Sequence, residues 1–83
     1  MAYKLKGSAT SVDTTATNLG LATMVFVYND NADDVAITIA GSGSPYAGSI
    51  HIPTKGTMTI AKQGTDTIAC ATACMCTSVA SHW

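Results

Sequence analysis

Short runs of alternating apolar and polar residues dominate the chain, and turn residues separate these runs. Residues 21–28 form the strongest run, and because both of its faces are apolar we expect a strand at the centre of a sheet. A second strand is predicted at Val35–Ala40, where Val and Ile alternate with Ala and Thr. A third is predicted at Gly48–Ile52, with Ile50 and Ile52 pointing inward.

The segment after the third strand has the composition of a tight turn. Pro53 pre-sets one φ angle of such a turn, and Gly56 can supply a positive φ. Residues 57–62 then alternate again, with Met58 and Ile60 on the inward face. We therefore predict a β-hairpin over residues 48–62.

The first part of the chain carries a weaker signal. Residues 3–7 place Tyr3 and Leu5 on one face of a strand and two lysines on the other. The segment from Ser8 to Asn18 is rich in Thr, Ser and Ala, and Val12 is its one branched aliphatic side chain. We interpret this segment as a loop or a poorly anchored edge strand.

Two shorter strands, at residues 66–69 and 73–79, complete the pattern. The alanine-rich residues 69–76 leave a short helix open as an alternative. Six or seven short strands at roughly ten-residue spacing predict an all-β fold, namely a small antiparallel β-sandwich or barrel. We expect residues 1–83 to form a single domain.

The composition favours association with another protein. The chain has 83 residues with four Lys, five Asp and neither Arg nor Glu, so that 11% of its residues are charged and its net charge is −1. A charged fraction of about 25% is usual, and a net charge near zero promotes association. Four scattered lysines do not make the basic surface that nucleic-acid binding requires. Thirteen Thr and thirteen Ala provide a surface that loses little side-chain entropy on contact.

We expect the chain to be made and kept in a cytoplasm. No apolar run approaches the roughly 18–20 residues of a membrane span, and the first six residues are not followed by the apolar core of a signal peptide. Three cysteines, an odd number, fit reduced thiols better than a disulfide framework. We therefore predict no membrane partner.

The three cysteines are the one candidate cluster for metal chemistry. Cys70, Cys74, Cys76 and His82 spell C-x3-C-x-C-x5-H, and zinc accepts three thiolates and one imidazole. On a strand, however, Cys74 and Cys76 would lie roughly 6–7 Å apart on one face, which is too far for a zinc pair. A small disulfide is the other alternative. We favour reduced cysteines packed as small hydrophobic side chains, and we predict neither a metal nor a cofactor.

The residue pattern does not assemble an enzyme site. A hydrolase triad needs a His, a nucleophile and a carboxylate, and no nucleophile signature such as G-x-S-x-G accompanies His51 or His82. The acidic turn at residues 30–34 lacks the Gly and the Glu that an EF-hand uses to bind calcium. We therefore predict a non-enzymatic protein.

Two aromatic residues are candidate anchors for a partner's pocket. Tyr46 follows a loop of Gly, Ser and Pro, and Trp83 ends the sequence. The alternative is that each ring covers an end of its own domain. Together with the faces of the predicted strands, they give five candidate partner-binding residues, Tyr3, Leu5, Tyr46, His51 and Trp83.

Three segments together resemble small structural proteins from the virions of tailed phages, especially cyanophages. They are V-Y-N at residues 27–29, G-S-I-H-I-P at residues 48–53 and K-Q-G-T-D-T-I at residues 62–68. The likeness covers residues 21–71. The cysteines at positions 74 and 76 and the final S-H-W have no counterpart in it.

The resemblance implies a capsid decoration, or cement, protein that binds the major capsid protein on the outside of the shell. It also implies a homo-oligomer, as a trimer or as many copies on a lattice, and a location at the capsid surface of a virion. A tail or neck adaptor is one alternative. The other is a small receptor- or carbohydrate-binding module that uses Tyr46, His51 and Trp83.

Overall fold

The computed structural model describes residues 2–82, and the side chains of residues 2–80. It contains eight strands: β1 (Ala2–Leu5), β2 (Thr10–Val12), β3 (Met24–Tyr28), β4 (Val35–Ala40), β5 (Gly48–Ile52), β6 (Thr57–Ala61), β7 (Thr67–Cys70) and β8 (Cys74–His82). The predicted all-β class is confirmed. The alternative helix at residues 69–76 is wrong, because strands occupy both ends of that stretch. Among the described residues, no helix is long and apolar enough to cross a membrane.

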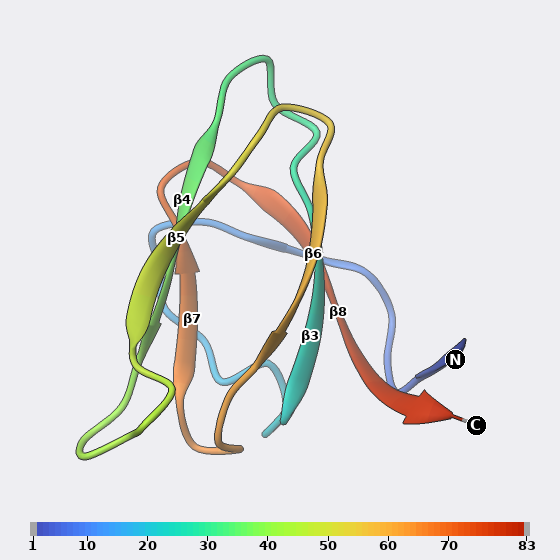
Figure 1. Ribbon diagram of the computed structural model, residues 1–83, viewed down its shortest axis with the longest axis vertical. Helices are drawn as coiled ribbons and strands as arrows, with labels where there is room; N and C mark the ends of the chain where they lie inside the picture. The colour runs from blue at the N-terminus through green and yellow to red at the C-terminus, as the bar shows by residue number, and fades with distance from the viewer. Residues whose placement is uncertain (1, 83) are drawn as a thin grey trace.

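The strands form two antiparallel sheets (Figure 1). In the larger sheet the order is β1-β8-β3-β6, and β2 also pairs with β8. The first two strands lie end to end along one edge of β8, since β2 pairs with residues 74–76 and β1 with residues 79–82. The smaller sheet has the order β5-β4-β7. The far end of β8 and β1 project from the body of the molecule as a two-stranded ribbon (Figure 1).

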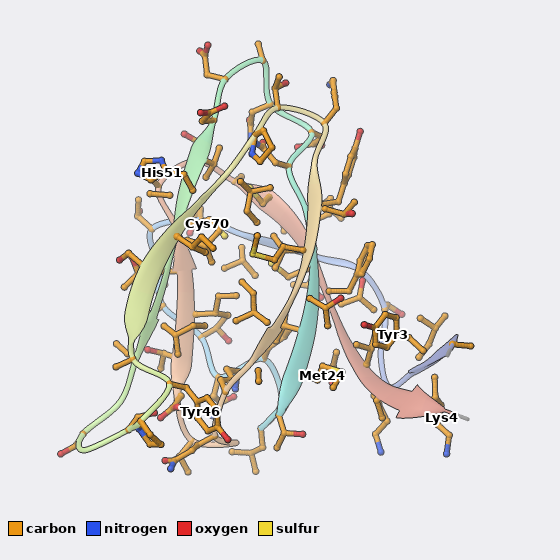
Figure 2. All side chains as sticks on the ribbon, in the orientation of Figure 1. Tyr3, Lys4, Met24, Tyr46, His51 and Cys70 are labelled. Atoms are coloured by element: carbon orange, nitrogen blue, oxygen red, sulfur yellow. The ribbon has the colours of Figure 1, made fainter. Side chains whose placement is uncertain are left out.

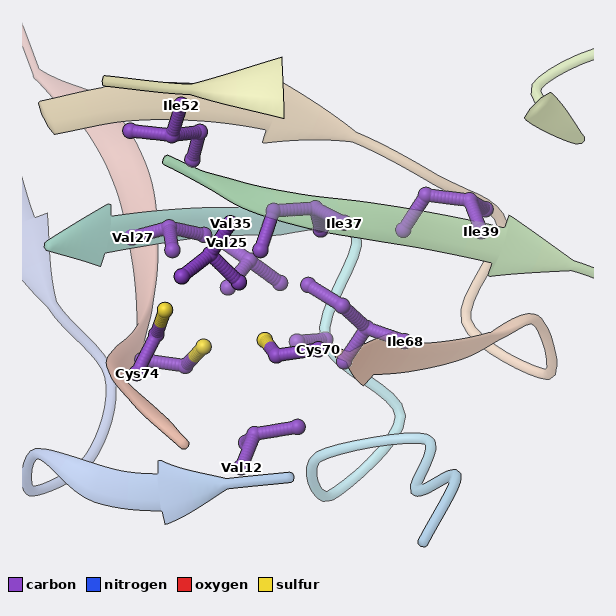
Figure 3. Close-up of a cluster of buried hydrophobic side chains, with 12 residues drawn as sticks. Val12, Val25, Val27, Val35, Ile37, Ile39, Ile52, Ile68, Cys70 and Cys74 are labelled. Atoms are coloured by element: carbon purple, nitrogen blue, oxygen red, sulfur yellow. The ribbon is translucent and has the colours of Figure 1, made fainter. Parts of the chain in front are cut away.

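The core lies between the two sheets (Figure 3). Every second residue of β3 and β4 points into it, which is the period-two burial that a strand with one covered face produces. Val12 of β2 closes one side of the cluster (Figure 3). The buried cluster comprises Val12, Ala22, Val25, Val27, Val35, Ile37, Ile39, Ile52, Ile68, Cys70, Cys74 and Cys76.

The predicted hairpin over residues 48–62 is wrong, because β5 pairs with β4 and β6 pairs with β3. The turn itself is present, since the Gly56 N–H donates to the Pro53 oxygen at 2.9 Å. The buried Asn29 amide fixes its direction by donating to the backbone oxygens of Ile52 at 3.0 Å and Pro53 at 3.2 Å. A turn with hairpin composition therefore carries the chain from one sheet to the other.

The segment from Ser8 to Asn18 is better anchored than predicted. Its strand β2 pairs with β8, and Val12 is only 2% exposed. Further along, Thr17 and Ile68 exchange backbone hydrogen bonds of 3.1 and 2.8 Å. The segment thus runs from the edge of one sheet to the edge of the other, and it is held by the pairing of β2 with β8, the buried Val12, a backbone bond of 2.8 Å from Cys70 to Asp13 and the bridge at Thr17.

The strongest predicted strand begins later than expected, at Met24. The residues before it, Leu19, Gly20 and Leu21, have φ angles of 54°, 67° and 62°, which are unusual for residues other than glycine. The side-chain oxygen of Asn18 accepts hydrogen bonds from the N–H groups of Gly20 at 3.1 Å and Leu21 at 3.4 Å. This local bonding replaces strand pairing with a left-handed turn.

The side chains predicted to point inward from β5 and β6 do point toward the core, but some of them are only partly buried. Met58 and Ile60 of β6 pack against the core and remain half-buried. Ile52 is fully buried, whereas Ile50, on the same face of β5, is 44% exposed. The cause is the position of β5, which pairs only with β4 and so leaves its other edge open.

Candidate functional site

The larger sheet has an apolar surface on the side that faces away from the core. Val25 and Val27 of β3 point inward and are fully buried, so Met24, Phe26 and Tyr28 point outward. Within residues 2–82, no second sheet lies on this side, and the three side chains are half-buried. An antiparallel sheet usually carries polar residues on its solvated face, so large apolar residues there mark a candidate interaction surface.

The neighbours of Phe26 and Tyr28 extend this surface across the sheet. Phe26 lies opposite Thr59 of β6 and Thr77 of β8. Tyr28 lies opposite Thr57 and Met75. In the described parts of β3, β6 and β8, none of the outward positions carries a charge. A partner can therefore cover this face without burying an unpaired charge.

The projecting ribbon adds two of the predicted binding residues to the same surface. Leu5 of β1 lies opposite Val79 of β8, and Tyr3 lies two residues along on the same face. Tyr3 is 44% exposed and Leu5 is 74% exposed. Figure 2 shows Tyr3 on the same side of the larger sheet as Met24. Val79 is 4% exposed but does not belong to the core cluster, which fits a position on the outward side of β8.

We call this surface the outer face. It consists of Tyr3 and Leu5 of β1, Met24, Phe26 and Tyr28 of β3, Thr57 and Thr59 of β6, and Met75, Thr77 and Val79 of β8. Four strands that are far apart in the sequence contribute to it.

Two hollows lie beside the lysine side of the ribbon, which is opposite to Tyr3 and Leu5. They adjoin the left-handed turn at residues 19–21. One has a volume of about 400 Å³ and the other of about 340 Å³, and Lys6, Gly20 and Ser78 line both. Leu19, Thr10 and Thr17 help to line the first hollow. Among the described residues that line these two hollows, Lys6 is the cationic side chain.

The other predicted binding residues do not gather at one place. Tyr46 is 51% exposed and His51 is also exposed. They lie toward opposite ends of the smaller sheet (Figure 2), away from Tyr3. Trp83 lies outside the described residues. The three-residue binding cluster of Tyr46, His51 and Trp83 thus has no assembled counterpart among the residues that are described.

The three cysteines are free thiols inside the core. Cys70 ends β7, while Cys74 and Cys76 point inward from β8 (Figure 3). The neighbouring Cys76 sulfur and burial raise the pKa of Cys70, and burial raises the pKa of Cys74 to about 11. These two thiols therefore stay protonated at neutral pH and are poor nucleophiles.

No metal-binding group emerges around the cysteines. Within the described part of the chain, no three His, Cys, Asp or Glu side chains are placed to hold a metal ion. The side chain of His82, the fourth residue of the zinc alternative, lies outside that part.

Three polar residues whose burial the sequence did not predict, Asn29, Lys62 and Asp66, lie inside the fold. Lys62 is 2% exposed, and its ammonium group donates to the backbone oxygens of Asn18 at 2.9 Å, Gln63 at 3.2 Å and Gly64 at 3.4 Å. Burial lowers the pKa of Lys62, and the nearby Asp66 carboxylate opposes this effect. The contacts all run to loop backbone, so Lys62 ties loops together at one end of the sandwich.

The carboxylate of Asp66 fixes a neighbouring loop. It is 2% exposed and accepts hydrogen bonds from the Ser44 hydroxyl at 2.6 Å and the Gln63 N–H at 2.9 Å. Gly41 must be glycine here, because a Cβ atom on it would come within 2.0 Å of the carboxylate. Both buried charges thus have structural partners.

The outer-face residues of β3 and β8 were not predicted as binding residues. The apolar residues on both faces of 21–28 predict a central strand, and β3 does lie between β8 and β6, but this pattern does not tell which side of the sheet faces the core. The pairing of β3 with β8 shows that Phe26, Thr77 and Met75 share the face of the sheet that points away from the core. Comparison of the chain with protein-family models, curated proteins and solved structures finds no match.

Proposed function

We propose that the protein is a non-enzymatic structural protein that binds another protein through its outer face. The observation that carries this proposal is the row of half-buried large apolar side chains on the outward side of the larger sheet, which has no charged position in the described parts of β3, β6 and β8 and continues into the exposed Tyr3 and Leu5. Aromatic and methionine side chains are enriched in the buried centres of protein interfaces, and Phe26, Tyr28 and Met75 are of these types.

The shape of the outer face supports a protein partner rather than a small ligand. The surface is built on paired strands, so its side chains are held in place before binding, and little conformational entropy remains to be lost. Thr57, Thr59 and Thr77 surround the large residues with short side chains that also lose little entropy. Tyr3 and Leu5 on the ribbon extend the contact beyond the body of the sandwich.

The partner that we propose is the major capsid protein of a virus, with this chain as a decoration protein on the outer shell. The resemblance of residues 21–71 to small virion proteins of tailed phages supports this step. A low-charge domain that presents one flat apolar face also suits attachment in many copies to a repetitive lattice.

The experiment uses purified shells assembled from the major capsid protein alone, mixed with purified chain and recovered by sedimentation. We expect saturable binding with a fixed number of copies per capsid protein. Thr59→Lys places a charge beside Phe26 on the outer face and is expected to weaken binding at least about 10-fold. Thr38→Lys is the matched control, since Thr38 is an exposed strand residue on the outer side of the smaller sheet.

Equal binding by the two variants would overturn the role of the outer face. Absence of binding to shells, together with a few copies per complete particle by quantitative mass spectrometry, would instead favour a tail or neck component. Binding to glycans that depends on Tyr46 would favour the carbohydrate-binding alternative, which the separation of Tyr46 from His51 does not support.

A further inference from the structure

The few charges of this protein are distributed unevenly. Lys62 and Asp66 are both buried and held by hydrogen bonds, so they contribute little to the surface. Lys4 and Lys6 are exposed on the ribbon. Asp30, Asp33 and Asp34 are exposed in the turn between β3 and β4. Figure 1 shows the ribbon and this turn at different ends of the molecule.

The acidic turn has little local neutralisation. The exposed lysine near it is Lys55, whose ammonium group donates to the backbone oxygen of Asp30 at 2.8 Å. The turn has three carboxylates and one nearby lysine, so its net charge is negative. The bends at residues 31–33 and the bonds of Asn29 to Asn31 and Asp33 hold its backbone in a fixed shape.

The ribbon end is net positive and has room for an acidic side chain. Its lysines point to the side of β1 opposite Tyr3 and Leu5, because side chains alternate along a strand. Lys6 borders the two hollows of about 400 and 340 Å³ described above. Ser78 also lines both hollows and Thr17 lines the first, and the hydroxyl group of each can donate a hydrogen bond to a carboxylate.

The lysines also disfavour a symmetric contact between copies. The outer edge of β1 is unpaired, and two such edges could join as antiparallel strands. That pairing would bring the lysines of both copies to the same face of the joined sheet, where like charges opposite each other are destabilising. The charge pattern therefore opposes a ribbon-to-ribbon dimer.

We propose that the chain associates with a second copy of itself head to tail, with Lys4 and Lys6 of one copy bound to the acidic turn of the next. Such a heterologous contact generates a closed ring or a chain of copies rather than a two-fold dimer. The contact uses the lysine side of the ribbon and leaves the outer face free for the proposed shell partner.

The test is sedimentation velocity of the purified chain over a range of concentrations. We expect self-association at about 20 mM NaCl that weakens at least about 10-fold at about 500 mM NaCl, because salt screens exposed charges. Lys4→Asp with Lys6→Asp should abolish it, and so should Asp33→Lys with Asp34→Lys. Asp13→Asn is the control, since Asp13 is an exposed acid that belongs neither to the turn nor to the ribbon.

Two rescue measurements make the inference specific. An equimolar mixture of the two double variants should associate again, because each ribbon then meets a turn of opposite charge. The chain that carries all four substitutions should also associate on its own. A wild-type chain that stays monomeric at low salt, or double variants that do not recover on mixing, would overturn the head-to-tail contact. Shell binding by Thr59→Lys is measured separately, so that failure of either proposal can be recognised.

Discussion

The side-chain amide of Asn29, just after β3, donates a hydrogen bond of 3.0 Å to the backbone oxygen of Ile52, at the end of β5. This bond joins the larger sheet to the smaller one. The same amide donates to Pro53 at 3.2 Å and to the Asp33 oxygen at 3.0 Å, while its oxygen accepts the Asn31 N–H at 3.0 Å. One buried side chain therefore organises both turns at this end of the sandwich.

Asn29→Ala is expected to lower the free energy of unfolding by about 3 kcal/mol, because it removes the buried amide bond to the Ile52 oxygen and the part-buried bonds to the oxygens of Asp33 and Pro53. The measurement is urea-induced unfolding followed by far-UV circular dichroism. The neighbouring exposed Asp30→Ala serves as the control and should stay within about 0.5 kcal/mol of wild type. A loss below about 1 kcal/mol for Asn29→Ala would contradict the organising role.

Two isoleucines of β5 provide a matched pair for core packing. Ile52→Ala should cost about 3 kcal/mol, because Ile52 is 0% exposed and its removal leaves a cavity between the sheets. Ile50→Ala should cost less than about 1 kcal/mol, because Ile50 is 44% exposed at the open edge of β5. The measurement is the free energy of unfolding of both variants in urea. Equal losses of stability would mean that the open edge of β5 is covered in solution.

Lys62→Met is expected to destabilise the fold by about 2 kcal/mol, since three backbone oxygens lose the ammonium group that binds them and Asp66 loses a nearby cation. Lys55→Met is the control, because Lys55 is exposed and contacts one backbone oxygen. Thermal unfolding should separate the two variants clearly. If Lys62→Met is as stable as Lys55→Met, then the cost of burying the lysine cancels the benefit of its bonds.

Alkaline pH should weaken the fold through the buried thiols. The pKa of Cys74 is raised from 9.0 to about 11, so the unfolded thiol loses its proton before the folded one does. The stability that depends on the neutral thiol is complete below about pH 9 and is lost as pH rises toward about 11, by roughly 3 kcal/mol for two pKa units. Urea unfolding at a series of pH values should therefore give a shallower decline for Cys74→Ala than for wild type. Parallel declines would show that Cys74 does not ionise differently in the two states.

The sequence predicted the fold class and most strand positions because alternation reports which face of a strand is buried. It did not predict pairing partners. A turn such as the one from Pro53 to Gly56 has the same residues whether it joins neighbours in a sheet or crosses between sheets, and Asn29, more than twenty positions away, decides between them. Alternation also gave the direction of Ile50 but not its exposure, which depends on the open edge of β5.

The candidate site was predicted in part, for a related reason. Alternation placed Tyr3 and Leu5 on one face of a strand, and the register of β1 with β8 confirms the shared face, although alternation alone did not indicate that both are exposed. Phe26 could not be assigned to a surface, because an apolar residue on a central strand has no local feature that tells a covered face from an uncovered one. Which face of β3 is covered depends on the side on which the second sheet packs, and the local sequence of β3 does not specify that side.

The position of β8 has a consequence for how the protein is made. This strand pairs with β1, β2 and β3, so residues near the start of the chain find their partners only when residues 74–82 have been synthesised. Contacts between such distant segments slow folding. The core and the outer face both need β8, so a nascent chain that ends before Cys74 has neither. The outer face is thus completed together with the fold, because β8 contributes Met75, Thr77 and Val79 to it, and an unfinished polypeptide on the ribosome does not present it.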